Sequence, residues 1–196
     1  MKKSNIIMLI AALLPLGLFV FPLWKITLEA PQYPTPLGMY IHINDFSDVH
    51  PHDIKNINLM NHYVGMKYIP EAIPEFKIFP AGIIITTIIG LVIAYFGNYK
   101  WFLSWFILMI VLSCAGLYDF YLWEHDYGHD LDPKAIMKFT NPDGTVMGFQ
   151  PPLFGSKDIL NFRAHSYPQL GALFLGLGIA ASLFAYLVGK KNQNKT

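Results

Sequence analysis

Four long apolar blocks constrain the fold of this chain more than any other feature of its sequence. They are residues 5–24, 78–96, 101–123 and 168–188, and none contains a charged residue except near an end. About 20 mainly apolar residues cross a bilayer, and within it only a helix satisfies the polar groups of its own backbone. The sequence therefore predicts an all-α membrane protein whose four transmembrane helices form a single membrane domain over residues 1–196.

The composition agrees with a membrane protein. Of the 196 residues, 54% are hydrophobic and 14% are charged, whereas about 25% are charged in ordinary soluble domains. The single cysteine, Cys114, excludes an intramolecular disulfide and a metal site built from several thiolates. Lys2 and Lys3 precede the first block as in a signal peptide, but no small-residue cleavage site follows it. We therefore interpret this block as a retained membrane anchor.

The lysine distribution predicts the orientation of the chain. One side of the predicted membrane has no acidic residue and six lysines, which are Lys2, Lys3, Lys100, Lys190, Lys191 and Lys195. All 13 acidic residues belong with the other side. The positive-inside rule then places both termini in the cytoplasm and the loops 25–77 and 124–167 on the opposite side of the membrane. We expect these loops to pack into an extracytoplasmic cap, which is too acidic to favour nucleic-acid binding.

The end of the third block is the first candidate metal site. If the helix continues beyond the membrane, His125 and His129 are four residues apart on one face, a spacing that suits two imidazoles on one metal ion. Asp119 is a carboxylate at membrane depth, where charge is costly, and is a candidate oxygen ligand or ring-orienting acceptor. In the alternative interpretation these residues cap the helix or mark the water boundary, and Gly128 ends the helix.

The first loop contains a second candidate site. His62 and Met66 are also four residues apart, and imidazole together with thioether sulfur suits Cu(I). Further outer methionines are Met39, Met60, Met137 and Met147. The alternative is that the methionines fill a core and His62 is a packing residue. We interpret the histidines of residues 50–53 as facing solvent.

The two candidate sites are expected to meet. The second and third predicted helices are joined by a tight turn, so they should be antiparallel neighbours, and the first loop should fold over the end of the third helix. Within that loop, residues 37–43 alternate weakly and predict a short strand, and residues 56–66 have helical spacing. We expect His62, Met66, His125 and His129 to converge above Asp119 and to bind copper.

Several chemistries are not indicated. The sequence has no Gly-rich phosphate loop, no nucleophile elbow, no His-Glu-x-x-His motif and no Cys-x-x-Cys-His haem attachment. We therefore expect a protein that is not an enzyme.

Sequence words in both outer loops resemble those of a known family. In the first loop they are residues 30–34, 37–40 and 57–66, and in the second loop residues 127–133, 149–157 and 160–162. With the four-helix layout, they resemble the small polytopic membrane proteins that accompany atypical nitrous oxide reductase systems, the NosB-like accessory proteins. The resemblance implies a role in the assembly of a periplasmic copper enzyme, or in electron supply to it.

Three functions are compatible with these observations. The first is an accessory protein that binds copper transiently on its outer face and hands it to a periplasmic copper enzyme or its maturation proteins. The second is a non-catalytic scaffold in the lipid bilayer that docks partner proteins or electron carriers, in a membrane complex or as a homo-oligomer. The third is a quinol-linked redox subunit, which would need a haem or another cofactor. We expect the first.

Overall fold

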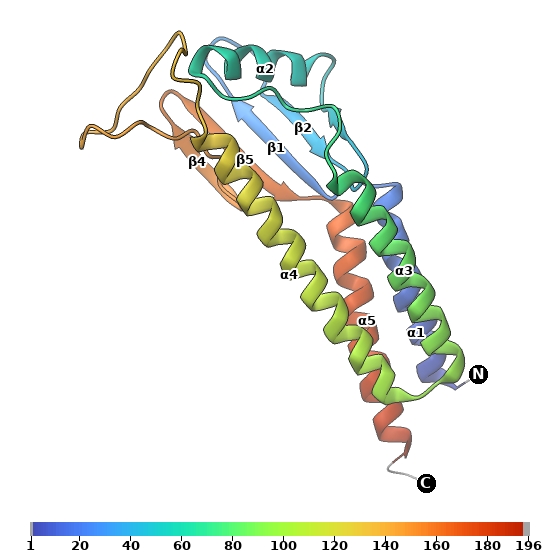
Figure 1. Ribbon diagram of the computed structural model, residues 1–196. Coiled ribbons are helices and arrows are strands. Elements are labelled where there is room, and N and C mark those ends of the chain that lie inside the picture. Colours follow the sequence, from blue (N-terminus) through green and yellow to red (C-terminus); the bar gives the residue numbers. More distant parts are fainter. Residues whose placement is uncertain (1, 194–196) are drawn as a thin grey trace.

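The computed structural model describes residues 2–193 and has a helical bundle with a five-stranded sheet at one end (Figure 1). The helices are α1 (Lys3–Leu13), continued by the 3-10 helix η1 (Leu14–Phe19), then α2 (Asp53–Val64), α3 (Glu75–Phe96), α4 (Tyr99–His129) and α5 (Leu170–Gln193). The strands are β1 (Trp24–Glu29), β2 (Leu37–Ile41), β3 (Phe46–Asp48), β4 (Gly155–Ile159) and β5 (Phe162–Pro168). The predicted all-α fold class is therefore wrong.

The sheet explains why that prediction failed. Its strand order is β3-β2-β1-β5-β4, and every neighbouring pair is antiparallel. The pair β1 and β5 joins segments that are far apart in the chain. Across this pair, the indole N–H of Trp24 on β1 donates to Oγ of Ser166 on β5, 142 positions away. No local sequence pattern reveals such a pairing. The strand predicted within residues 37–43 and the helix predicted within residues 56–66 are confirmed by β2 and α2.

Three helices, α3, α4 and α5, are long and apolar enough to cross a membrane, which is compatible with a membrane protein. The first apolar block is shorter as a helix than predicted, because α1 and η1 end at Phe19 and β1 begins at Trp24. An α-helix rises about 1.5 Å per residue and a 3-10 helix about 2.0 Å. The 11 residues of α1 and 6 of η1 therefore reach about 28 Å, close to the thickness of about 30 Å of a hydrocarbon core.

Small side chains and one buried indole hold the bundle together. The indole N–H of Trp105 on α4 donates to the backbone oxygen of Thr86 on α3, at 2.9 Å, and both side chains are buried. Gly90 lies beside this indole, since a Cβ there would be 2.9 Å from the indole nitrogen and 2.7 Å from Cβ of Ala12. Close contacts at small residues are typical of helix pairs in membranes.

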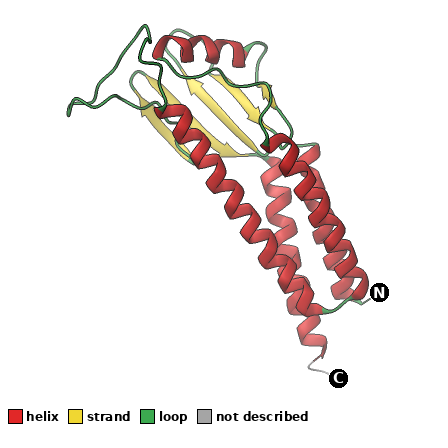
Figure 2. Ribbon diagram, in the orientation of Figure 1, coloured by secondary structure: helices red, strands yellow, loops and turns green. Residues whose placement is uncertain are grey.

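The inner face of the sheet is covered by α2 and by the last turns of α4 (Figure 2). The 31 residues of α4 extend about 46 Å, which exceeds the hydrocarbon thickness of about 30 Å. Phe120 packs edge-on against Trp24, the first residue of β1, with ring centroids 5.7 Å apart. The turns of α4 beyond Trp123 therefore lie beside the sheet, in addition to the length of helix that a bilayer would require.

Candidate functional site

The two histidines at the end of α4 are neighbours, as their spacing predicts. Their rings are stacked, with centroids 4.3 Å apart and planes 18° apart, and both side chains are exposed. The helix continues past Gly128 to His129, so Gly128 does not end it. Gly128 instead lets another segment pass close to the helix, because a Cβ there would lie 2.5 Å from Cα of Gln150.

A backbone contact determines which nitrogen of His129 is free. Nδ1 of His129 lies 2.9 Å from the carbonyl oxygen of His125. Because a carbonyl oxygen only accepts, Nδ1 carries the proton and Nε2 keeps a free lone pair. Metal-binding histidines commonly hold this tautomer through such a second contact. Gly148 packs closely against this ring, since a Cβ on Gly148 would lie 2.5 Å from Nε2 and 2.6 Å from Cδ2.

The other predicted ligands have different surroundings. The exposed ring of His62 is stacked on Tyr68, with centroids 6.2 Å apart. Gly65, with φ +83°, ends α2, so Met66 leaves the helical face of His62 and lines a cavity. Asp119 is on the side of α4 toward the start of α3, where Glu75 is its charged neighbour. Among residues 2–193, no group of three His, Cys, Asp or Glu side chains lies close enough to hold a metal ion.

The histidine-rich loop at residues 50–53 has a structural role. Oδ2 of the buried Asp53 accepts hydrogen bonds from the backbone N–H groups of Gly38 and His50, at 2.8 and 2.9 Å. The same oxygen is 3.2 Å from Nδ1 of His50. These contacts fasten the start of α2 to β2.

The first loop folds over the outer end of α4, as the topology predicts. The backbone N–H of Asp132 donates to the carbonyl oxygen of Gly65 at 2.8 Å, and that of Met137 donates to Tyr63 at 2.9 Å. Lys67 forms an ion pair with Asp130. The hydrogen bond and the charge of Asp130 raise the pKa of Lys67 above its usual value. The backbones of the two predicted sites are therefore adjacent, although His62 and His125 belong to different ring clusters.

An apolar cavity lies behind this junction, between the inner face of the sheet, α2 and the end of α4. Its volume is about 190 Å³. Four methionines line it, which are Met39, Met60, Met66 and Met137. Most other lining residues are aliphatic or aromatic, among them Ile26, Leu28, Ile57, Trp123, Phe149 and Phe162.

Two polar side chains from α4 line the cavity without partners. Glu124 is fully buried, and neither carboxyl oxygen has a hydrogen-bond partner among the described residues. The hydroxyl of Tyr127, three positions along the helix, is also buried and without a partner there. A buried polar group without a hydrogen bond costs about 1–3 kcal/mol. Such a cost, paired with an adjoining cavity, is typical of a site that receives a ligand.

The sequence reasoning missed this cavity and also a row of polar contacts that joins three strands. Glu124 is the first charge after Trp123, at helical spacing from Tyr127, and this spacing is the signal that could have identified the polar pair. In the row of contacts, Nδ1 of His165 is 2.6 Å from Oγ of Ser156, and Nε2 is 3.2 Å from Oε1 of Glu29. Comparison with protein-family models, with curated proteins and with solved structures found no match to the chain.

Proposed function

We propose that the protein is a membrane-anchored accessory protein of a copper enzyme, and that it presents copper on His125 and His129. The observation that supports this function most directly is the Nε2 of His129, which the contact at Nδ1 leaves free, next to a second exposed imidazole. Imidazole is a good copper ligand. Two exposed ligands hold a metal ion less firmly than a closed site, which suits hand-over to another protein.

The membrane arrangement is part of the same proposal. The chain spans the bacterial inner membrane four times, with α1 and η1 as the short span, and both termini are cytoplasmic. The six lysines that support this orientation come from both termini and the α3–α4 turn, and Figure 1 places these at the end of the bundle away from the sheet. Lys195 lies outside the described residues. The sheet and the histidine pair are then extracytoplasmic.

Cysteine labelling tests the orientation. In a Cys114→Ser background, a membrane-impermeant thiol reagent added to intact spheroplasts should label Thr145→Cys in the outer loop. It should label Lys100→Cys, in the α3–α4 turn, only after the membrane is permeabilised. The reverse pattern would contradict the orientation and with it access of the histidine pair to an extracytoplasmic enzyme.

The partner is a periplasmic copper enzyme of the nitrous oxide reductase type, or one of its maturation proteins. This part of the proposal is supported by the resemblance of the loop sequences at residues 57–66 and 127–133 to the NosB-like accessory proteins. Both segments lie at the junction between α2 and the end of α4, where the histidine pair is exposed.

Copper titration of the full chain in detergent tests the site. Under reducing conditions, a chromogenic Cu(I) chelator competes with the protein. We expect the double substitution His125→Ala and His129→Ala to weaken Cu(I) binding at least tenfold. The matched control is His62→Ala, another exposed histidine, which should leave the affinity unchanged. Equal affinity of the wild type and the double variant would refute the copper site and favour the scaffold function.

A further inference from the structure

The cavity beneath α2 offers a binding site that is independent of the histidine pair. It is lined by β1, β2, β5, α2, the end of α4 and the segments around Phe149 and Ile159. An empty apolar cavity of about 150 Å³ is known to remain dry and to bind benzene. The volume of about 190 Å³ found here therefore suits a molecule slightly larger than one benzene ring.

The wall of the cavity favours an aromatic occupant. Thioether sulfur makes favourable contacts with aromatic rings, and the unbranched methionine side chain adapts to irregular shapes. Four methionines and the rings of Trp123, Tyr127, Phe149 and Phe162 line the same space. A metal ion is a poorer match, because it would draw its sulfur ligands to within about 4 Å of one another at bond lengths of about 2.3 Å. Here about 190 Å³ stays open between the walls.

Two hydrogen-bonding groups in the cavity favour a ligand that carries a polar atom. The carboxyl of Glu124 and the hydroxyl of Tyr127 are both buried and have no partner among residues 2–193. They lie three positions apart on α4, which brings them to one face of the helix. The hydroxyl group of a ligand can donate to a carboxyl oxygen of Glu124 and can accept from the hydroxyl of Tyr127.

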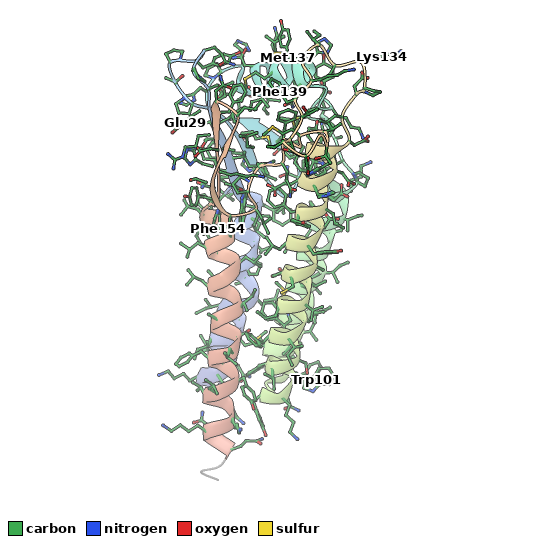
Figure 3. All side chains as sticks on the ribbon, turned by 90° about the vertical axis from the view of Figure 1, so that its left-hand side faces the viewer. Glu29, Trp101, Lys134, Met137, Phe139 and Phe154 are labelled. Carbon is green, nitrogen blue, oxygen red and sulfur yellow. The ribbon has the colours of Figure 1, made fainter. Side chains whose placement is uncertain are left out.

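The cavity also has an exposed rim through which a ligand can pass. Tyr63 and Met137 line it and are 41% and 43% exposed. Figure 3 shows Met137 at the end of the molecule opposite Trp101, so this rim is away from the membrane-spanning helices. At the same rim, Nε2 of Gln32 is 3.5 Å from the sulfur of Met60. The polar pair on α4 is deeper, so the ligand enters with its polar end first.

We propose that this cavity binds a small aromatic alcohol, whose hydroxyl group hydrogen-bonds to Glu124 and Tyr127 and whose ring contacts the methionines. Recognition thus has two separable parts, an apolar one from the wall and a polar one from the two α4 side chains.

A comparison of two probes tests this assignment on the full chain in detergent. Isothermal titration calorimetry is carried out with para-ethylphenol and with ethylbenzene, which differ only in the hydroxyl group. We expect saturable one-to-one binding of para-ethylphenol at least tenfold tighter than that of ethylbenzene, a difference of about 1.4 kcal/mol. Equal binding of the two probes, or no saturable binding, would overturn the proposal, and neither outcome depends on a variant.

Two variants and one control variant then locate the site. Glu124→Leu with Tyr127→Phe should remove the preference for the alcohol, whereas Met147→Leu, outside the cavity, should retain it. Ala164→Leu fills the cavity from β5 and should abolish binding, which also gives the background from the detergent micelle. Displacement of para-ethylphenol by Cu(I) in the wild type would assign the cavity to a metal and overturn the proposal. Failure of copper binding at His125 and His129 would leave this result unaffected.

Discussion

Replacement of Glu124 by methionine should stabilise the protein. The carboxyl is fully buried among apolar side chains, and both of its oxygens are without hydrogen-bond partners in residues 2–193. A partnerless buried polar group costs about 1–3 kcal/mol, and an apolar side chain of similar size removes that cost. We therefore expect Glu124→Met to raise the free energy of unfolding by about 1–3 kcal/mol. A residue retained at such a cost is typical of a functional site.

Thermal unfolding in detergent, followed by circular dichroism, measures this effect. For a chain of this length, about 1 kcal/mol shifts the melting temperature by about 2–4 °C. The matched control is Glu71→Met at an exposed glutamate, which should change stability by less than about 0.5 kcal/mol. An unchanged or lower melting temperature for Glu124→Met would mean that the carboxyl contributes to the fold and is not a free ligand-binding group. Para-ethylphenol at a concentration that saturates the wild type should stabilise the wild type more than the variant.

Three further substitutions test the described contacts. Gly148→Ala places a Cβ 2.5 Å from Nε2 and 2.6 Å from Cδ2 of His129, which forces this exposed ring to move. Cu(I) affinity should therefore fall at least tenfold in chelator competition while the melting temperature stays the same; unchanged affinity would contradict a role of the present ring position in copper binding. Trp105→Phe removes the hydrogen bond to Thr86 and should cost about 1–3 kcal/mol in thermal unfolding; a neutral result would argue that this bond is not made. Gly65→Ala forces an alanine into the left-handed conformation and should lower the free energy of unfolding by about 1–2 kcal/mol. Because Met66 then shifts, para-ethylphenol should bind more weakly in calorimetric titration. Unchanged binding would show that the turn at Gly65 does not position Met66.

The bundle was largely predictable from the sequence because the length of an apolar segment is a local property. The blocks at residues 78–96, 101–123 and 168–188 correspond to α3, α4 and α5 with ends that differ by a few residues. The sheet was not predictable in the same way. β1 and β5 pair across more than a hundred residues, and Trp24 is apolar enough to be taken as the end of a helix although it begins a strand.

The candidate sites also differ in how far local sequence predicts them. The pairing of His125 with His129 follows from helical spacing alone, and the structure brings these rings together. The cavity depends on the meeting of four strands, two helices and parts of the loops, so no single segment reveals it. Gly65 was a usable signal, because a glycine directly after a helical stretch commonly ends the helix and redirects the next side chain, here Met66.

The neighbouring strands β1 and β5 make the sheet a rigid extension of the bundle. Only residues 20–23 separate η1 from β1, and only Gln169 separates β5 from α5, while α1 and α5 pack along each other below. The sheet therefore cannot swivel as a head on a flexible stalk would. In the membrane arrangement proposed above, the orientation of the sheet relative to the bilayer follows the tilt of α1 and α5, and that tilt responds to bilayer thickness. Lipid composition would then change the angle at which the exposed end of α4 is presented to a partner.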